Sequence, residues 1–146
     1  MKIAVGSDHG AYERKQTLID HLKKCGYEVE DFGCHSAESC DYPDFGSAVA
    51  RAVADGEYER GIVLCTTGIG ISITANKIKG IRCALCTYVE QARLTREHND
   101  ANVLAIAAKY TDEELANEMA DVFLNTEFSN AERHLRRINK IKELEE

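Results

Sequence analysis

Proline and long apolar runs are scarce in this chain of 146 residues, and positive charge is in the minority. One proline and no low-complexity stretch leave no segment typical of a linker, so residues 1–146 are expected to form a single domain. No run approaches the ~18–20 apolar residues that span a bilayer. The net charge of −7 disfavours binding to nucleic acid or an anionic membrane, because both require a cationic face. Met1–Ile3 leads straight into a strand pattern, so the expected location is cytoplasmic.

Common cofactor and metal signatures are also missing. Residues 7–11, SDHGA, follow the first strand pattern without the GxGxxG sequence, and the turn Gly68–Gly70 supplies no third glycine. A Rossmann-type dinucleotide is therefore not expected. Six cysteines are scattered along the chain, and the one CxxC, Cys83–Cys86, lies in a strand pattern, where residues three apart point to opposite faces. We expect no metal site, no organic cofactor, and cysteines that stay reduced.

Strand patterns alternate with helix patterns along the whole chain. Strands are predicted at Lys2–Ser7, Tyr27–Phe32, Gly61–Cys65, Ile81–Cys86 and Asn102–Ala107. Helices are predicted at Tyr12–Lys24, Asp44–Asp55, Gly70–Lys77, Glu90–His98, Asp112–Leu124 and Asn130–Glu145. Pro43 suits the first turn of the second helix, and Thr111 with Glu114 forms a capping box before the fifth.

Repeated strand–helix units predict a parallel sheet with right-handed crossovers. The expected fold is α/β, a three-layer sandwich with a five-stranded parallel Rossmann/flavodoxin-like sheet and helices on both faces. In the flavodoxin-like order 2-1-3-4-5, the first and third strands are neighbours where the strand order reverses, and ligands bind there at the carboxyl ends. Asp8 and His9 follow the first strand and Cys65 ends the third, so these side chains are expected to converge.

The segment Gly61–Lys77 carries the strongest signal for chemistry. A strand delivers Cys65 to a glycine-bearing turn, Thr66–Gly70, and a helix pattern follows. Unpaired backbone N–H groups at such a helix start favour an anion, either a phosphate or a developing oxyanion. The same positive dipole end favours a thiolate. The alternative interpretation is a tight strand–helix connection with a buried cysteine.

Two polar clusters lie later in the chain. His98 and Asn99 belong to a dense polar segment before the fifth strand, which is equally typical of a solvated loop with a helix-end histidine. Arg133 and Arg137 are four apart on the final helix, a spacing that lets both guanidinium groups reach one phosphate. The alternative for this pair is a solvent face in which both arginines pair with Glu132 and the acidic tail.

Four motifs in order resemble the ribose-5-phosphate isomerase type B family, which also holds allose-6-phosphate isomerase and the galactose-6-phosphate isomerase subunits. The motifs are GSDHG at 6–10, DYPDF at 41–45, CTTGIGISITANKIKGIR at 65–82 and REHNDANVLA at 96–105. The resemblance covers essentially the whole chain. It implies an aldose–ketose isomerase that interconverts ribose 5-phosphate and ribulose 5-phosphate through an enediolate.

The resemblance also implies roles for individual residues. Cys65 matches the base that moves the proton between the two carbons, and His98 matches the acid that helps to open the furanose ring. Ring opening needs an acid–base pair, and His98 with Asp8 are suitable candidates for it. The loop that binds the enediolate oxygens, with Thr67 among its catalytic members, matches Thr66, Thr67, Gly68, Ile69 and Gly70. Further substrate contacts match Asp8, His9 and Asn99, and phosphate ligands match Lys109, Arg133 and Arg137.

Relatives of this kind are dimers or tetramers whose site is completed across a subunit interface, and they use no metal or organic cofactor. The resemblance therefore implies a homodimer or homotetramer in which the C-terminal helix reaches a partner subunit. Two residues depart from the family pattern: Thr66 stands where glycine is usual, and Lys109 where arginine is usual. Two alternatives stay open, an isomerase of a hexose 6-phosphate such as allose 6-phosphate, and a non-catalytic phosphosugar-binding module.

Overall fold

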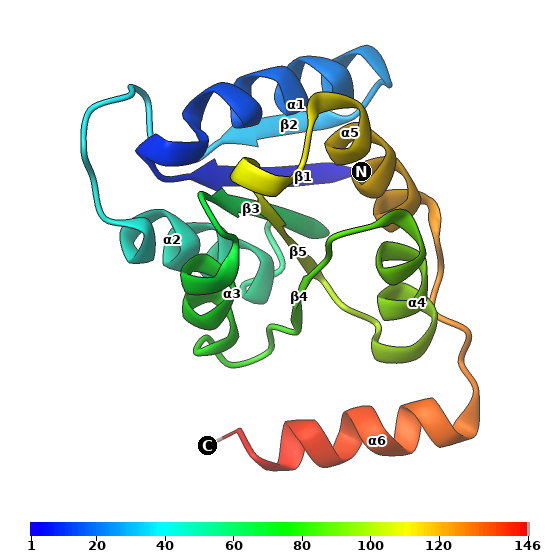
Figure 1. The fold of residues 1–146 in the computed structure, drawn as a ribbon. Coiled ribbons are helices and arrows are strands. Elements are labelled where there is room, and N and C mark those ends of the chain that lie inside the picture. Colours follow the sequence, from blue (N-terminus) through cyan, green and yellow to red (C-terminus); the bar gives the residue numbers. More distant parts are fainter. Residues whose placement is uncertain (146) are drawn as a thin grey trace.

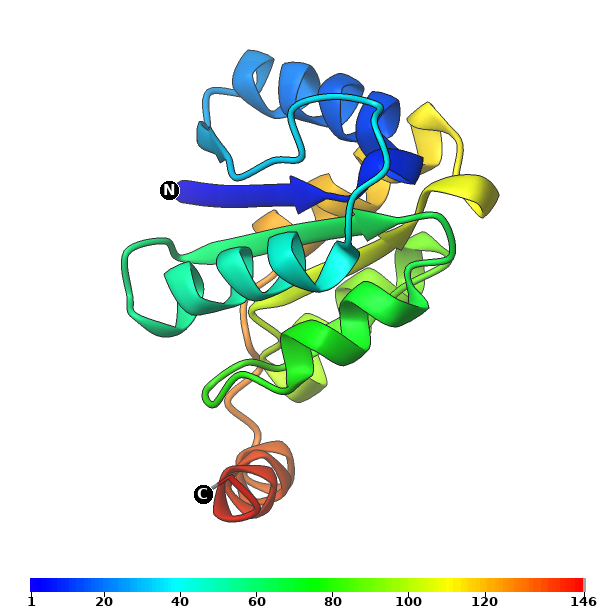
Figure 2. The ribbon, with the colours of Figure 1, turned by 90° about the vertical axis from the view of Figure 1, so that its left-hand side faces the viewer.

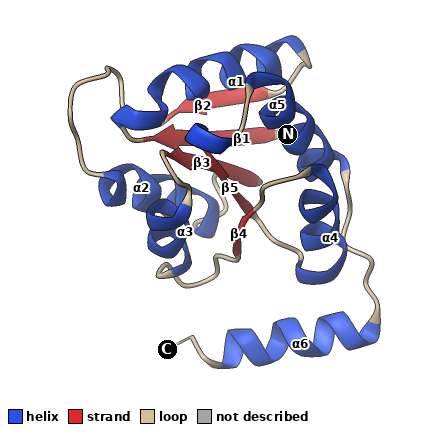
Figure 3. Ribbon diagram, viewed as in Figure 1, coloured by secondary structure: helices blue, strands red, loops and turns tan. Residues whose placement is uncertain are grey.

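The computed structural model describes residues 1–145, which form a five-stranded sheet with helices on both faces (Figures 1 and 3). All strand pairs are parallel. The strands are β1 (Lys2–Ser7), β2 (Glu28–Asp31), β3 (Arg60–Cys65), β4 (Cys83–Leu85) and β5 (Val103–Ala107). The helices are α1 (Tyr12–Lys24), α2 (Tyr42–Ala54), α3 (Ile69–Asn76), α4 (Val89–Asn99), α5 (Glu113–Asn125) and α6 (Glu132–Glu143), with two 3-10 turns, η1 (His9–Ala11) and η2 (Ala108–Tyr110). The predicted three-layer α/β class is confirmed.

The strand order is β2-β1-β3-β5-β4, so the expected order 2-1-3-4-5 was wrong at one edge. β5 lies inside the sheet because all five of its residues are apolar and buried, as a strand flanked on both sides requires. β4 has only three residues, all half-buried, and it forms the edge; the predicted strand Ile81–Cys86 was too long. The predicted contact between β1 and β3 is confirmed, with Ser7 opposite Leu64.

The central strands β1, β3 and β5 contribute side chains to two separate apolar layers. On β3, Ile62 and Leu64 pack into the layer under α1, α4 and α5, while Val63 and Cys65 pack into the layer under α2 and α3. Figure 2 shows α2 and α3 together on one face of the sheet. The same alternation separates the CxxC pair, because Cys83 packs on the second layer and Cys86 on the first. The prediction that these two thiols face opposite sides is confirmed.

Two helix starts follow from local capping. Asp41 is the N-cap of α2, with Pro43 in the first turn, as the sequence indicated. The predicted capping box at α5 was wrong, because the N-cap is Asp112, whose Oδ1 accepts a hydrogen bond of 2.8 Å from the Leu115 N–H. Thr111 is buried instead. The charged carboxylate of Asp112, one residue later, caps the helix and leaves Thr111 to pack.

Two cations are buried and fix the packing of helices. Lys15 of α1 is fully buried, and its Nζ lies 2.7 Å from both carboxylate oxygens of Asp31 at the end of β2. Arg96 of α4 is 2% exposed, bonds Asp100 and the Thr126 carbonyl, and lies over the Phe123 ring. Buried charges require such partners, so both residues are structural.

Helix α6 stands apart from the sheet (Figures 1 and 2). It buries only His134 and Ile138 and contacts α4 near its own beginning. Just after α6, the Glu145 carboxylate accepts a hydrogen bond from the N–H of Gly80, which precedes edge strand β4 in the chain. Within residues 1–145 no helix is both long and apolar enough to cross a membrane.

Candidate active site

The carboxyl ends of β1 and β3 place Asp8 beside Cys65. Ser7 lies opposite Leu64 in the sheet, and the Asp8 N–H donates to the Leu64 carbonyl at 3.3 Å. Cys65 is 4% exposed and Asp8 7% exposed. The Oδ1 atom of Asp8 is buried and has no hydrogen-bond partner among the described residues. Such an atom is costly to leave unpaired, and a substrate hydroxyl would satisfy it.

The turn after Cys65 is shaped by Gly68, the N-cap of α3. Gly68 has φ 72°, and a β-carbon there would meet Leu85 Cδ1 at 2.5 Å and the Ala107 nitrogen at 3.0 Å. Glycine is therefore needed twice, for the left-handed backbone and for the close approach to β5. The Thr67 hydroxyl accepts a hydrogen bond of 3.3 Å from the Ile69 N–H. The remaining N–H groups of the first turn precede any helical acceptor and are available to an anion.

The imidazole of His9 is oriented by a loop that the sequence did not connect to it. The Cys40 N–H donates to Nδ1 of His9 at 3.1 Å, so in the neutral ring the proton lies on Nε2. The Cys40 thiol lies 3.9 Å from the same nitrogen. Nε2 of His9 is therefore the donor left for a ligand.

A crevice of about 370 Å³ opens over this edge of the sheet, lined by Gly10, Glu13, Arg14, Thr66, Ala108 and Lys109. Thr66 does not adopt positive φ, so the threonine that replaces the usual glycine is unstrained in its backbone. Its hydroxyl occupies the space that a β-carbon on Gly10 would need, 2.2 Å away. Thr66 also holds the next turn, because its carbonyl accepts from the Lys109 N–H at 3.0 Å.

Arg14, which the sequence did not single out, also lines this crevice. Its Nε is buried without a hydrogen-bond partner, and among residues 1–145 no carboxylate forms an ion pair with Arg14 or Lys109. Two cations and one carboxylate, Glu13, thus line the crevice, and neither cation is paired with Glu13. A signal was present: helical side chains tilt towards the N-terminus, and Arg14 lies in the first turn after Asp8 and His9.

Tyr42 is a second residue that the sequence did not single out. Its ring lies against Gly70, so the first turn of α2 covers the beginning of α3. The tyrosine is 39% exposed, which leaves part of the ring open to a ligand or a neighbouring subunit. The motif DYPDF contained this residue, but its spacing gave no indication of which helix it would contact.

The structure places His98, Asn99, Arg133 and Arg137 together, but away from Cys65. His98 and His134 stack with ring centroids 4.3 Å apart and planes at 20°, which joins α4 to α6. Desolvation, followed by the neighbouring Arg133, His98 and Arg137, lowers the pKa of His134. Arg133 and Arg137 are exposed, as the alternative of a solvent face predicts, but they form no ion pair with any described carboxylate, so the pairing with Glu132 is not observed.

The sheet itself separates the two groups. His98 and Asn99 are the last two residues of α4, just before β5. At that end of the sheet the Gly61 N–H, near the beginning of β3, donates a hydrogen bond to the Asn102 carbonyl. Ala107, at the other end of β5, lies opposite Cys65. A five-residue strand spans roughly 13 Å. His98 also lines a different groove, between β4 and α4, to which Cys65 does not contribute. Asp8, His9 and Cys65 therefore lie at the same edge of the sheet, as expected, whereas His98 of the same chain lies near the other end of β5.

Comparison with known proteins decides the family. Residues 3–141 match the family model described as Ribose/Galactose Isomerase. The chain belongs to this family. It is 43% identical to ribose-5-phosphate isomerase B of Escherichia coli over 145 residues, 99% of this chain and 97% of the relative. The solved structure of Clostridium thermocellum ribose-5-phosphate isomerase B has a TM-score of 0.97 and 55% identity, over 99% of this chain and 97% of that chain.

This family member is thus a sugar phosphate isomerase, and relatives differ in the sugar that they are named for. Galactose-6-phosphate isomerase subunit LacB of Clostridium acetobutylicum is 40% identical over 144 residues, 99% of this chain and 83% of the relative. Its identity is close to that of the E. coli ribose-5-phosphate enzyme. The choice of sugar consequently has to be argued from the residues of the crevice.

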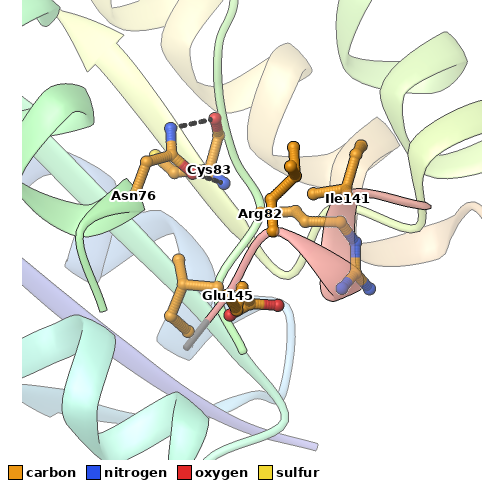
Figure 4. Close-up of a pocket in the computed structure, with 7 residues that line it drawn as sticks. Asn76, Arg82, Cys83, Ile141 and Glu145 are labelled. Carbon is orange, nitrogen blue, oxygen red and sulfur yellow. Dashed lines mark hydrogen bonds between the residues drawn. The ribbon is translucent and has the colours of Figure 1, made fainter. Parts of the chain in front are cut away.

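A second cavity, of about 450 Å³, lies elsewhere (Figure 4). It is lined by Asn76, Ile81, Arg82, Cys83, Ile141, Leu144 and Glu145, between edge strand β4 and the end of α6. Asn76 is committed to the backbone of Cys83 through hydrogen bonds of 2.9 and 2.8 Å. Burial raises the pKa of the Cys83 thiol, so no thiolate forms there near neutral pH. None of the predicted site residues lines this cavity, and it is not the candidate active site.

Proposed function

We propose that this isomerase interconverts ribose 5-phosphate and ribulose 5-phosphate through an enediolate, with Cys65 as the base. The observation that carries the proposal is the meeting of three groups where β1 and β3 end: the Cys65 thiol, the Asp8 carboxyl group with its unpaired Oδ1, and His9 with Nε2 free to donate. Pure binding of a phosphosugar would need only cations and N–H groups, so the thiol and the acid favour catalysis.

The proton transfer needs a base and a stabilised oxyanion. A Cys65 thiolate takes the proton from carbon 2 of the aldose, and negative charge develops on the carbonyl oxygen of carbon 1. The hydroxyl proton of carbon 2 then passes to the oxygen of carbon 1, and the Cys65 thiol returns its proton to carbon 1, which gives the ketose. Fixed N–H donors at the start of α3, together with Thr67, stabilise that oxygen without reorganisation. One such donor is typically worth ~3–4 kcal/mol of transition-state stabilisation. Thr66 to Gly70 supply this loop.

The phosphate end is held by positive charge outside the reacting carbons. Lys109 and Arg14 line the crevice next to Thr66, and the planar fork of Arg14 supplies paired donors that the Lys109 ammonium lacks. This contact orients the substrate, because a fixed phosphate places carbon 2 near the base. Arg133 and Arg137 add two more cations to the same phosphate group.

A homo-oligomer with shared sites explains how the second group of residues reaches the crevice. His98, Asn99, Arg133 and Arg137 would come from a partner subunit, carried by α4 and α6 as one unit joined at the His98–His134 stack. The partner's His98 and the Asp8 of the first chain would then open the furanose ring. Exposed apolar side chains on α3 and α6, among them Ile69, Ile73 and Leu135, favour such an interface.

An isomerase of a hexose 6-phosphate is the second candidate, and the LacB relative favours it. The deciding experiment compares kcat/KM for ribose 5-phosphate with that for allose 6-phosphate and galactose 6-phosphate, using protein assayed with a chelator. We expect the pentose phosphate to give the highest value without added metal. A hexose phosphate turned over faster would overturn the substrate assignment, and no turnover of any of the three would favour the non-catalytic binding module.

A further inference from the structure

Three side chains capable of binding a metal converge between α1 and α5. His21 belongs to the last turn of α1, Cys25 is the C-cap of that helix, and Asp121 lies on α5. Nε2 of His21 lies 2.8 and 2.9 Å from the two carboxylate oxygens of Asp121 and 3.7 Å from the Cys25 sulfur. The three ligand atoms all lie within 4.8 Å of one another.

The two separations from His21 are close to those around a tetrahedral ion. Zinc bonds of about 2.0–2.1 Å to nitrogen, 2.3 Å to sulfur and 2.0–2.2 Å to oxygen imply ligand–ligand separations of roughly 3.3–3.7 Å. The sulfur–nitrogen pair of Cys25 and His21 already has this spacing. Without an ion, His21 and Asp121 form a hydrogen bond. On metal binding the distance between Nε2 and the carboxylate oxygen would increase by about half an ångström, which a small rotation of the carboxylate allows.

The ligands stand on rigid elements and face solvent. His21 and Cys25 are four residues apart, which places both on one face of α1. α1 and α5 share the apolar layer that contains Leu18, Leu22 and Met119, so their relative position is fixed. The side chains of His21 and Asp121 are 27% and 38% exposed, and Cys25 is exposed, so an ion has access and water can fill a fourth position.

We propose that His21, Cys25 and Asp121 form a binding site for a divalent transition metal of the zinc type. The imidazole, thiolate and carboxylate set suits Zn²⁺ better than the hard cations Mg²⁺ and Ca²⁺, which require oxygen ligands. On binding, the Cys25 thiol loses its proton to solvent, and Nε2 of neutral His21 exchanges its hydrogen bond to Asp121 for the metal while the ring proton moves to Nδ1.

The site is separate from the isomerase chemistry. α1 begins next to Asp8 and His9 and ends at Cys25, so the cluster lies a whole helix away from the crevice. A bound ion would clamp α1 to α5 and stabilise the folded state by mass action. It would leave turnover unchanged, so the proposal is independent of the proposed substrate.

The test is a titration of the metal-free protein with Co²⁺, whose bond to a thiolate gives a near-ultraviolet charge-transfer band. We expect a one-equivalent band in the wild type that Zn²⁺ abolishes, its loss in Cys25→Ser, and at least tenfold weaker binding in Asp121→Asn. Cys40→Ser is the matched control, because the Cys40 thiol also lies close to a histidine nitrogen, Nδ1 of His9. The control should keep the band.

Three outcomes would overturn the proposal: no band in the wild type, a band that survives Cys25→Ser, or a band lost in Cys40→Ser instead. A thermal-unfolding scan gives a second readout. Zn²⁺ should raise the Tm of the wild type and of Cys40→Ser but not that of Cys25→Ser. Equal shifts in all three proteins would place the ion elsewhere and would equally overturn the assignment.

Discussion

The imidazole rings of His98 and His134 stack at 4.3 Å, and this contact ties α6 to α4 at the point where Arg133 and Arg137 are presented. His134 is 8% exposed, whereas both arginines are exposed. The stack therefore fixes the position of His98 on α4 relative to Arg133 and Arg137 on α6.

The stack predicts a dependence of stability on pH. Because the pKa of His134 is lowered from its ordinary value of 6.5, the unfolded chain binds a proton more readily than the folded chain. Above pH 6.5 His134 is neutral in both states and does not lower the free energy of unfolding. As the pH falls from 6.5 through the lowered folded-state pKa, protonation of His134 favours the unfolded chain and the free energy of unfolding decreases. In urea unfolding, the free energy of unfolding should fall less between pH 7.5 and pH 5.5 for His134→Gln than for the wild type. An equal loss in both would contradict the prediction.

Cys65→Ala should lower kcat by about a hundredfold or more with little change in KM, because a base acts chiefly in the transition state. Steady-state kinetics checks this, with Cys25→Ala as the control, since Cys25 is exposed and lies far from the crevice. Alkylation with substrate present adds a second readout, because substrate should protect Cys65. Full activity in Cys65→Ala would remove the thiol from the mechanism.

Arg14→Gln should raise KM for ribose 5-phosphate by about tenfold, the loss of roughly one charge-assisted hydrogen bond, with kcat little changed. Inhibition by inorganic phosphate should weaken in parallel. Arg51→Gln, an exposed arginine of α2, is the matched control and should behave as wild type. Unchanged phosphate inhibition in Arg14→Gln would mean that this side chain does not contact the anion.

Gly68→Ala should lower both Tm and kcat, because the new β-carbon adds a clash with Leu85 and β5 to the cost of a left-handed backbone. The backbone cost alone is about 1–2 kcal/mol. Gly26→Ala separates the two effects, since Gly26 has φ 93° with open space around it and lies at the end of α1. It should lose some stability but keep full activity. If Gly68→Ala turns over substrate normally, the shape of this turn is not critical.

Much of the fold was predictable because it follows from local periodicity. The contact between β1 and β3, and with it the meeting of Asp8 and Cys65, followed from the order of parallel units. The exchange of β4 and β5 did not, because the pattern of Ile81–Cys86 reads as a long strand although only three of its residues pair. The order of the strands in a sheet depends on how each strand is covered in the folded protein, and the periodicity of the sequence does not encode that order.

The site was predictable where motifs specify it and not where tertiary contacts do. Lys15 reads as a solvated helix residue but is buried against Asp31. The hydrogen bond from Cys40 to His9 joins segments 31 residues apart, and spacing alone gives no indication of it. The sequence shows that His98 and Asn99 precede the fifth strand, but it does not show how far they lie from Cys65. Only the sheet topology shows that the length of β5 separates His98 from Cys65.

The most direct test of the central proposal, a site built from two chains, is complementation between inactive variants. Cys65→Ala keeps the α6 arginines, and the Arg133→Ala/Arg137→Ala double variant keeps the thiol. When the two are unfolded together and refolded, each mixed dimer should contain one native site, so activity should reappear. Mixed dimers that form, as shown by differently tagged subunits, but stay as inactive as either parent would contradict the account.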